Sequence, residues 1–257
     1  MFVDTHCHIH DARFDSDRTL VLQRARESGI SKMISIGCDL ETTRQARALS
    51  QTHQDIYFSA GYHPHEAKSA SPENLAEIKK LALHKKCVAI GECGLDYHYD
   101  HSPREVQQRI FAEQIRLAKE LRKTLVVHVR DAFDDCFKLL DGFPFSDVPV
   151  VIHCFTGSLD VATRFIELGC TISISGIATF KEPGQLHEVI SMAPLSQLLI
   201  ETDAPYLAPL PYRGKRNEPS YIVKVAEIVA QLKSLTLNDA AQALTDNSVR
   251  VFKLGRK

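Results

Sequence analysis

The amino-acid sequence predicts an α/β protein of the (β/α)8 class, a TIM barrel. Short apolar runs alternate with longer segments of helical spacing along the whole chain, and no long polar linker interrupts them. Several of the runs are nearly continuous in Ile, Val, Leu and Ala, which is typical of strands in a parallel sheet covered on both sides. A single barrel takes about 250 residues, and this chain has 257.

The expected strands are the eight apolar runs. They lie at residues 2–10, 33–38, 56–61, 87–92, 125–129, 148–154, 170–175 and 198–202. An open doubly wound sheet is the alternative arrangement. It is disfavoured because no Gly-x-Gly-x-x-Gly or phosphate-loop sequence follows an early strand. We therefore expect one domain over residues 1–257.

The expected helices fill the intervals between these runs. They lie at residues 17–28, 41–52, from 71 onward, 102–123, 160–168, 183–191, 220–232 and 236–254. In the first, Leu20, Leu22 and Ala25 form the apolar side. Ser71-Pro72 places an N-cap before Pro at the first helical position, and Ser102 before Pro103 is expected to begin its helix in the same way. The last helix has no strand after it and is expected to pack across the barrel.

Composition excludes several classes of protein. The net charge is −1, so no global attraction to nucleic acid exists and any such binding must be local. No run of roughly 18 apolar residues is present, and the start lacks a signal-peptide pattern. The seven cysteines contain no Cys-x-x-Cys pair, which favours reduced thiols and a cytoplasmic protein. We expect a monomer that does not bind membranes.

Histidines and carboxylates stand at the carboxyl ends of the expected strands, where such barrels place their active sites. They are His6 and His8, His63, Glu92, His128, His153 and Asp203. These groups are costly within apolar strands unless they are paired or bound to metal. Imidazoles with carboxylates suit a pair of divalent ions of the zinc or manganese type.

Three cysteines directly follow proposed ligands, but a thiolate site is not expected. Strand alternation turns Cys7, Cys93 and Cys154 away from the ligand face, where they serve as small buried apolar residues. The remaining histidines are interpreted as loop, surface or helix residues. They are His10, His53, His65, His84, His98, His101 and His187.

Several motifs together resemble the TatD-type metal-dependent deoxyribonucleases, a family of amidohydrolase-like barrels. The motifs are VDTHCH at 3–8, GYHPH at 61–65, GECGLDY at 91–97, HCFTG at 153–157, ETDAPYL at 201–207, and Arg213 with NEP at 217–219. They span essentially the whole chain. The resemblance implies a barrel hydrolase with a two-metal site that acts on phosphodiesters.

The resemblance also implies a ligand set. His6, His8 and Asp203 would hold one ion, Glu92 would bridge to the second, and His128 with His153 would complete the second. Two bridged ions can acidify a shared water. Asp203, beside that water, would be the general base. The identity of the metal stays open among zinc, manganese, magnesium and nickel.

Four further residues are candidates for roles in the site. His63 would contact the substrate phosphate or the water, or make a structural hydrogen bond. Arg213, in the basic loop 212–217, would grip a phosphate, although a solvated loop would look the same. Glu201 shares the strand face of Asp203 and has either an indirect or a direct role. Asp96 orients a neighbouring ligand or caps its loop, and the structural role is favoured.

The preferred function is a deoxyribonuclease that trims single-stranded DNA ends, with Asp203, Glu92 and His63 as its catalytic residues. The DNA substrate follows from the resemblance, since the residues alone give only metal-assisted hydrolysis. An amide or ester hydrolase, or an aminoacyl-ester deacylase, could use the same metal site. A non-catalytic barrel that keeps its metals for stability is the third alternative. Tyr97, Tyr99, Tyr206 and Tyr212 are the rings available to stack bases.

Overall fold

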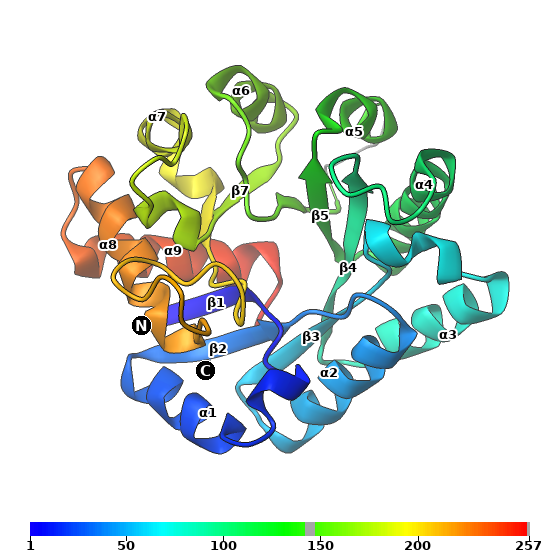
Figure 1. Cartoon of the computed structure of the whole chain (residues 1–257), viewed down its shortest axis with the longest axis horizontal. Helices are drawn as coiled ribbons and strands as arrows, with labels where there is room; N and C mark the ends of the chain where they lie inside the picture. The colour runs from blue at the N-terminus through cyan, green and yellow to red at the C-terminus, as the bar shows by residue number, and fades with distance from the viewer. Residues whose placement is uncertain (142–146, 256–257) are drawn as a thin grey trace. The chain divides into compact units, whose positions relative to one another are not determined.

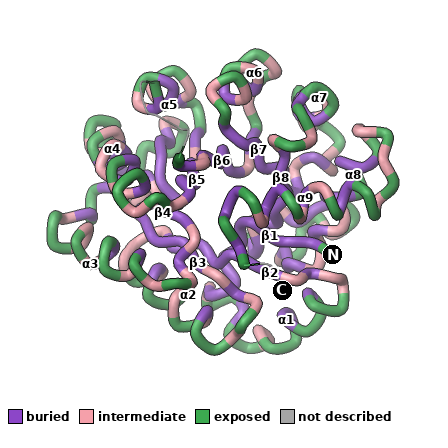
Figure 2. The backbone as a smooth tube through the Cα atoms, turned by 180° about the vertical axis from the view of Figure 1, so that it is seen from behind, coloured by how far each residue is buried: buried purple, intermediate pink, exposed green. Residues whose placement is uncertain are grey.

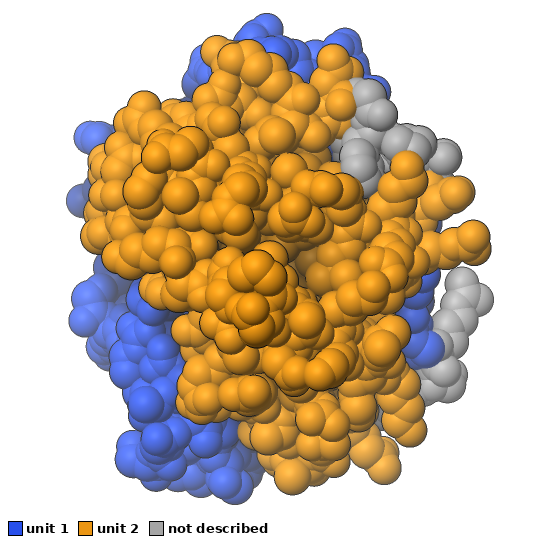
Figure 3. All heavy atoms as spheres, turned by 90° about the vertical axis from the view of Figure 1, so that its right-hand side faces the viewer, with its two compact units in different colours: residues 1–35, 154–257 blue, residues 36–153 orange. Residues whose placement is uncertain are grey.

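The computed structural model describes residues 1–141 and 147–255. Strands and helices follow one another in turn along the chain (Figure 1). The contacts divide the chain into two compact units (Figure 3). The first unit comprises Met1–Ser35 and Cys154–Lys257, and the second comprises Ile36–His153.

Four strands and five helices are described in the first unit. Its strands are β1 (Phe2–Cys7), β2 (Ile30–Ser35), β7 (Thr171–Ile174) and β8 (Leu198–Ile200). β1 pairs with β2 and β7 pairs with β8, both in parallel. Its helices are α1 (Arg18–Glu27), α6 (Leu159–Glu167), α7 (Leu186–Met192), α8 (Ile222–Leu232) and α9 (Leu237–Val251). α9, the helix without a following strand, packs against β1 and β8.

The second unit repeats the same pattern in the middle of the chain. Its strands are β3 (Ile56–Ala60), β4 (Cys87–Asp96), β5 (Thr124–Arg130) and β6 (Val150–Ile152). Each pairs with the next in parallel. Its helices are α2 (Leu40–Thr52), α3 (Pro72–Ala82), α4 (Arg104–Leu121) and α5 (Phe133–Leu140). Parallel neighbours bring the carboxyl ends of the strands to one edge, so polar residues at those ends are collected there.

The strands are the most buried part of each unit. Every residue of β1, β6, β7 and β8 is buried, whereas the helices alternate between buried and exposed positions (Figure 2). Apolar strands and amphipathic helices are what a sheet covered by helices requires. Among the described helices, none has both the length and the apolar character needed to cross a membrane.

Some sequence-based boundaries differ from the structure. The second strand covers Ile30–Ser35, three residues before the predicted run, because Gly37 and Cys38 already belong to the turn into α2. The eighth strand ends at Ile200, two residues before its predicted end. α5 was not predicted, because its eight residues after β5 are too few for a clear apolar period. Its buried face is Cys136, Phe137 and Leu140.

Two further predictions about the helices need correction, the apolar face of α1 and the cap of α4, whereas the cap of α3 is as predicted. In α1 the buried face is Val21, Leu22 and Ala25, and Leu20 is exposed. The Ser71 side chain caps α3 as predicted, by accepting the N–H of Asn74. Ser102 does not cap α4, which begins after Pro103. The Ser102 hydroxyl instead donates to the carbonyl oxygen of His65, at 2.8 Å, and so ties the loop after β4 to the loop after β3.

Candidate metal centre

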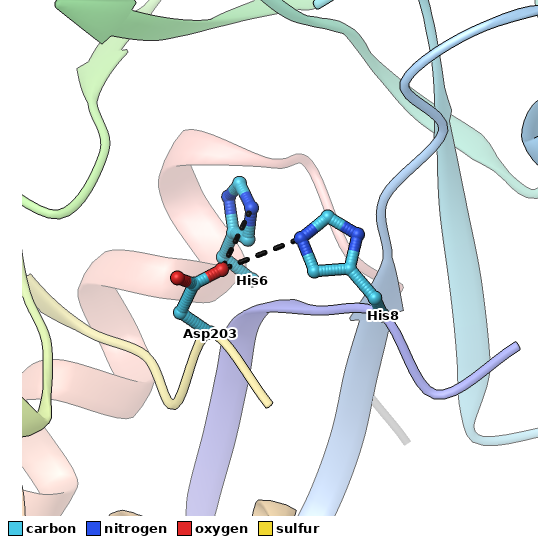
Figure 4. A group of neighbouring side chains, drawn as sticks. All are labelled: His6, His8 and Asp203. Atoms are coloured by element: carbon cyan, nitrogen blue, oxygen red, sulfur yellow. Dashed lines mark ion pairs between the residues drawn. The ribbon is translucent and has the colours of Figure 1, made fainter. Parts of the chain in front are cut away.

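The first cluster of candidate ligands belongs to the first unit. His6 lies in β1, His8 just beyond its end, and Asp203 follows β8. The Nε2 atoms of His6 and His8 lie 3.6 and 3.3 Å from Asp203 Oδ1 (Figure 4). The possible ligand atoms of the three residues all lie within 4.8 Å of one another. The chain therefore brings two imidazoles and one carboxylate to a single point.

Main-chain hydrogen bonds hold this cluster in place. The N–H of Asp203 donates to the carbonyl oxygen of His6 at 2.9 Å, and the N–H of His8 donates to the carbonyl oxygen of Ala204 at 2.6 Å. Asp203 adopts a left-handed backbone with φ 56°. This conformation is tolerated by Asp better than by most residues. The end of β1 and the segment after β8 are thus joined on both sides of the candidate ligands.

Asp4 supports the same junction and was missed as a functional position by sequence reasoning. It is fully buried, and its Oδ2 accepts the hydroxyl of Thr202 at 2.6 Å while its Oδ1 accepts the Thr202 N–H at 3.0 Å. Burial raises the pKa of Asp4 to about 7, against the opposing effect of these hydrogen bonds. The sequence does contain a signal that could have identified Asp4, because it is an acidic residue inside an apolar strand and lies on the same strand face as His6.

The second cluster surrounds Glu92 in the second unit. Glu92 Oε1 lies 3.5 Å from His63 Nε2, 3.1 Å from His128 Nδ1 and 3.4 Å from His153 Nε2. His63 and His153 follow the ends of β3 and β6, whereas Glu92 and His128 lie within β4 and β5. Glu92 is 3% exposed, so its carboxylate faces the histidines and not bulk water. A contact set of this kind on neighbouring parallel strands is what histidines near strand ends predict.

Close backbone approach makes this convergence possible. A Cβ atom at Gly61 would lie 2.7 Å from the backbone of Gly91, and one at Gly94, where φ is 132°, would overlap the carbonyl oxygen of His128. Only glycine permits both contacts. The Gln114 side chain from α4 then binds both main-chain groups of Tyr62, accepting its N–H at 2.7 Å and donating to its oxygen at 3.0 Å. These contacts fix the turn that carries His63.

Asp96 lies at the end of β4, where one of its oxygens contacts two histidines and the other caps the loop. Its Oδ2 is 3.0 Å from His128 Nε2 and 3.0 Å from His65 Nε2. Its Oδ1 accepts the N–H groups of His98 and Tyr99, which caps the loop. His65, which was interpreted as a loop, surface or helix residue, lies in the 3-10 helix η2 (Pro64–Ser69), and its contact with Asp96 also places it beside the second cluster. Sequence reasoning could not detect this contact, because the two partners are 31 positions apart in the chain.

The surroundings shift the pKa values of the second cluster in different directions. Burial lowers the pKa of His63 well below its usual value, although Glu92 opposes this effect. Burial would also lower the pKa of His128, but hydrogen bonds to Asp96 and Glu92 outweigh it and raise the pKa. For Asp96, burial would raise the pKa, and the hydrogen bonds from His128 and His65 lower it far below the usual range.

Two residues with uncertain roles can now be placed. Glu201 is fully buried, and its Oε2 accepts the hydroxyl of Ser173 at 2.6 Å, so it lies deeper than Asp203. His10, which was interpreted as a loop, surface or helix residue, lies in the turn after β1, but it is buried there and its Nδ1 lies 2.9 Å from Ser35 Oγ. Burial lowers the pKa of His10 to about 3. His10 is therefore a neutral core histidine next to His8.

The thiols differ from one another. Cys7 and Cys93 are completely buried, as expected for small apolar residues. Cys154 is only half-buried, and its Sγ lies 3.1 Å from Ser175 Oγ. Its left-handed backbone, with φ 44°, breaks the strand alternation on which the prediction relied. Cys38, which was not singled out, places Sγ 3.8 Å from Glu92 Oε2.

The basic loop at 212–217 contains two different kinds of arginine. Arg216 binds Asp17 with both Nη atoms, at 2.8 and 2.7 Å, and is a structural residue. Arg213 is exposed, with its guanidinium 3.9 Å from the centre of the Phe180 ring. That stacking holds the plane of the guanidinium while its edge stays accessible.

The donor set fits divalent metal ions. Both clusters combine imidazole nitrogens with carboxylate oxygens in buried positions, the ligand types that zinc and manganese prefer. Burial favours a neutral imidazole at His63, which adds no positive charge beside the Glu92 carboxylate. A cation between Glu92 and its histidines would offset the cost of burying these polar groups. Fold and clusters together define a metal-dependent hydrolase of the (β/α)8 class.

Comparison with known proteins gives the family. The sequence model of the TatD-related DNase family matches residues 3–253, and the chain belongs to this family. A metal-dependent hydrolase of Bacillus subtilis, YabD, whose function is uncharacterised, is 41% identical over 99% of this chain and 100% of its own length. The 3′-5′ ssDNA/RNA exonuclease TatD of a Rahnella strain is 35% identical over 96% of each chain. The resemblance seen in the sequence is confirmed.

Solved structures confirm the fold class. The crystal structure of YjjV, a TatD homologue of Escherichia coli, superposes with a TM-score of 0.93 and 32% identity, over 99% of this chain and 98% of that one. A TatD-family hydrolase from Entamoeba histolytica gives a TM-score of 0.88 at 24% identity. The chain is therefore a (β/α)8 barrel, as its strand and helix pattern predicts, and the open-sheet alternative is excluded.

Proposed function

We propose that this protein hydrolyses phosphodiester bonds of nucleic acid, trimming single-stranded DNA ends, with one divalent ion held by each cluster. The observation that carries the proposal is the pair of buried clusters of imidazoles and carboxylates at the ends of parallel strands. The 3′-5′ ssDNA/RNA exonuclease activity in the name of the Rahnella relative supports the substrate class.

The ligands proposed for the ions are those implied by the sequence. His6, His8 and Asp203 would hold one ion, and Glu92, His128 and His153 the other; zinc, manganese and magnesium all suit such donors. Bound ions would polarise the phosphoryl oxygens and make water more acidic. That Glu92 bridges the two ions stays a prediction drawn from the resemblance.

The carboxylate of Asp203 is the proposed general base. Its side chain is 13% exposed, so water can reach it, while Asp4 and Glu201 are fully buried. The main-chain bonds at His6 and Ala204 hold Asp203 rigidly, which suits a group that must take a proton from attacking water at a fixed place. Glu201 accepts a hydrogen bond from Ser173, and it would act only indirectly, through the surroundings of Asp203.

His63 and Arg213 are the proposed contacts to substrate. The His63 side chain is 13% exposed, and its Nε2 faces the Glu92 cluster. Its neutral ring would donate a hydrogen bond to a phosphate oxygen without adding charge. Arg213 offers an exposed guanidinium edge, whose fork geometry matches a phosphate.

The tyrosines divide into occupied and accessible rings. Tyr212 stacks on Tyr221 at 3.9 Å, and Tyr97 binds Asp135 through its hydroxyl. Tyr206 and Tyr99 are 47% and 51% exposed, and Tyr206 lies edge-on to His8 with ring centres 5.8 Å apart. We therefore propose Tyr206 as the surface on which a base stacks. The guanidinium of Arg13 lies 4.3 Å from the centre of its ring and adds positive charge for a phosphate. Tyr99 is less accessible to a base, because the His101 ring stacks on it and the Arg130 guanidinium lies 4.9 Å from its centre.

The decisive experiment uses purified protein loaded with Zn²⁺, Mn²⁺ or Mg²⁺ and an end-labelled single-stranded DNA oligonucleotide. A metal-dependent ladder that is absent in both His128→Ala and Asp203→Asn would support the proposal and show which end is attacked. An intact oligonucleotide, with metal still bound by elemental analysis, would contradict it and favour a carbonyl hydrolase on the same site.

Two general properties belong to the same proposal. The seven cysteines are free thiols, which fits a reducing compartment such as the cytoplasm. We expect a monomer, which light scattering at the working concentration would check.

A further inference from the structure

We propose that His63 and His128 are held in the same Nε2–H tautomer but present opposite nitrogens to Glu92, so that His128 offers Nδ1 to a metal ion and His63 offers its Nε2–H to an anionic group of the substrate. Asp96 selects this tautomer in His128, and the backbone N–H of His65 selects it in His63. The inference rests on the proposed function, because it divides the histidines of that same site into a ligand and a donor.

The tautomer of His128 follows from its partner. His128 Nε2 lies 3.0 Å from Asp96 Oδ2. The other oxygen of Asp96 already accepts two backbone N–H groups, from His98 at 3.0 Å and Tyr99 at 2.9 Å, so the side chain acts as an ionised acceptor. Nε2 must then carry the proton. In a neutral ring this leaves the lone pair on Nδ1, which points at Glu92 Oε1 at 3.1 Å.

The tautomer of His63 is set by the main chain. His63 is the N-cap of the 3-10 turn η2 (Pro64–Ser69), and its Nδ1 accepts the N–H of His65 at 3.1 Å. An acceptor nitrogen carries no proton, so a neutral His63 has its proton on Nε2. This atom faces Glu92 Oε1 at 3.5 Å. Pro64, which lies between the two partners, restricts the backbone and keeps the bond in place.

The two rings therefore present different nitrogens to Glu92 Oε1, the protonated Nε2 of His63 at 3.5 Å and the unprotonated Nδ1 of His128 at 3.1 Å. Distances alone place His63, Glu92 and His128 in one possible metal group. An Nε2–H cannot ligate a metal, because its lone pair is used by the proton. His63 is thus a neutral hydrogen-bond donor to a phosphate oxygen, and His128 is a ligand. Asp96 is a positioning residue, acting through His128.

The first test measures tautomers directly. Long-range ¹H–¹⁵N spectra of the metal-free protein, at a pH where both rings are neutral, should show the Nε2–H form for both His63 and His128. Zn²⁺ should then shift Nδ1 of His128 and leave Nδ1 of His63 unchanged. A Zn²⁺-induced shift at either nitrogen of His63 typical of coordination, or an Nδ1–H form of His63, would overturn the inference.

The second test measures metal content and affinity in variants. His63→Ala should keep the metal stoichiometry of the wild type by elemental analysis, and lower kcat/KM for the oligonucleotide at least tenfold. Asp96→Asn retains one side-chain oxygen that can cap the loop, but it presents an NH₂ group in place of the other oxygen to His128 Nε2. It should weaken Zn²⁺ binding about 10–100-fold, as is typical when the hydrogen-bond partner of a metal ligand is lost.

His65→Gln is the matched control, since it removes the second ring from Asp96 but retains the backbone N–H that holds His63. It should keep both metal affinity and the His63 tautomer. Loss of metal from His63→Ala comparable to that of His128→Ala would refute the division of roles. If the tautomers and metal contents are as expected but no nucleic acid is cleaved, the proposed function fails and the assignment of tautomers stands.

Discussion

The two candidate metal clusters are built from similar side chains but are held in different ways. In the first unit, main-chain bonds between His6 and Asp203 and between His8 and Ala204 fix the ligands. In the second unit, side chains from distant parts of the sequence do this work: Asp96 orients His128 and Gln114 fixes the turn before His63. The first cluster thus depends on backbone conformation, and the second on buried polar side chains that can be replaced one at a time.

The largest effect is expected at the centre of the second cluster. Glu92→Ala removes the carboxylate shared by three histidines. Activity should fall by more than about 100-fold, beyond the loss typical of an outer partner of a ligand, and the ion of that cluster should be lost. Circular dichroism should show an intact fold. Wild-type activity with full metal content would contradict the role given to Glu92.

A pair of variants tests whether each cluster holds its own ion. His8→Ala should lose the ion of the first cluster and His128→Ala that of the second, and each should retain about one metal ion per chain. Elemental analysis after dialysis gives the stoichiometry. Complete loss of metal in both variants would mean that the two sites bind metal only together. The clusters would then differ only in the hydrogen bonds that hold their side chains, and not in independent metal binding.

The side-chain support of the second cluster predicts a large cost in stability at Gln114. Gln114→Leu leaves the N–H and C=O of Tyr62 buried without this partner. Each such group costs about 1–3 kcal/mol, so the free energy of unfolding should fall by about 2–6 kcal/mol in urea titrations. Gln108→Leu is the control. Gln108 binds the side chains of Tyr97 and Asp135 near the surface, so this replacement should cost less than about 1 kcal/mol. Equal losses of unfolding free energy in the two variants would contradict the stabilising role given to Gln114.

The first cluster predicts a pH effect through its buried neighbour. Burial lowers the pKa of His10 to about 3, whereas the unfolded chain has the usual value of about 6.5. Between these two pKa values the unfolded state carries a proton on His10 that the folded state does not. The stabilising contribution of the neutral His10 ring is therefore present above about pH 6.5, and it is lost as the pH falls, by about 1.4 kcal/mol per pH unit. Urea titrations of metal-free protein at pH 7 and pH 5 should show a smaller difference for His10→Asn. An unchanged difference would mean that His10 is protonated in the folded state.

The smallest effects separate the two arginines of the basic loop. Arg213→Ala should raise KM for the oligonucleotide several-fold, up to about tenfold for a loss of about 1.4 kcal/mol, and leave the Tm unchanged. Arg216→Ala should lower the Tm by a few degrees, because it breaks the paired bonds to Asp17. A raised KM in Arg216→Ala at unchanged Tm would reverse this assignment.

The sequence predicts the fold class and the candidate ligands because their signals are local. His6 and His8 alternate on one strand, and the other ligands stand where apolar runs end. What supports them is not local: Asp96 and His65 are 31 positions apart, and Gln114 reaches Tyr62 from a helix 52 positions later. Cys154 could not be predicted either, because one left-handed residue changes the side to which a side chain points.

The glycines beneath the second cluster have a consequence for comparative mutagenesis. Gly61 and Gly94 carry no reactive group, yet any side chain at either position would collide with the backbone of a neighbouring strand. In a complete substitution library selected for activity, both positions should tolerate as few replacements as the histidines themselves. A map of intolerant positions would therefore mark out more than the chemistry, since part of it records how closely the strands must approach for that chemistry to be assembled.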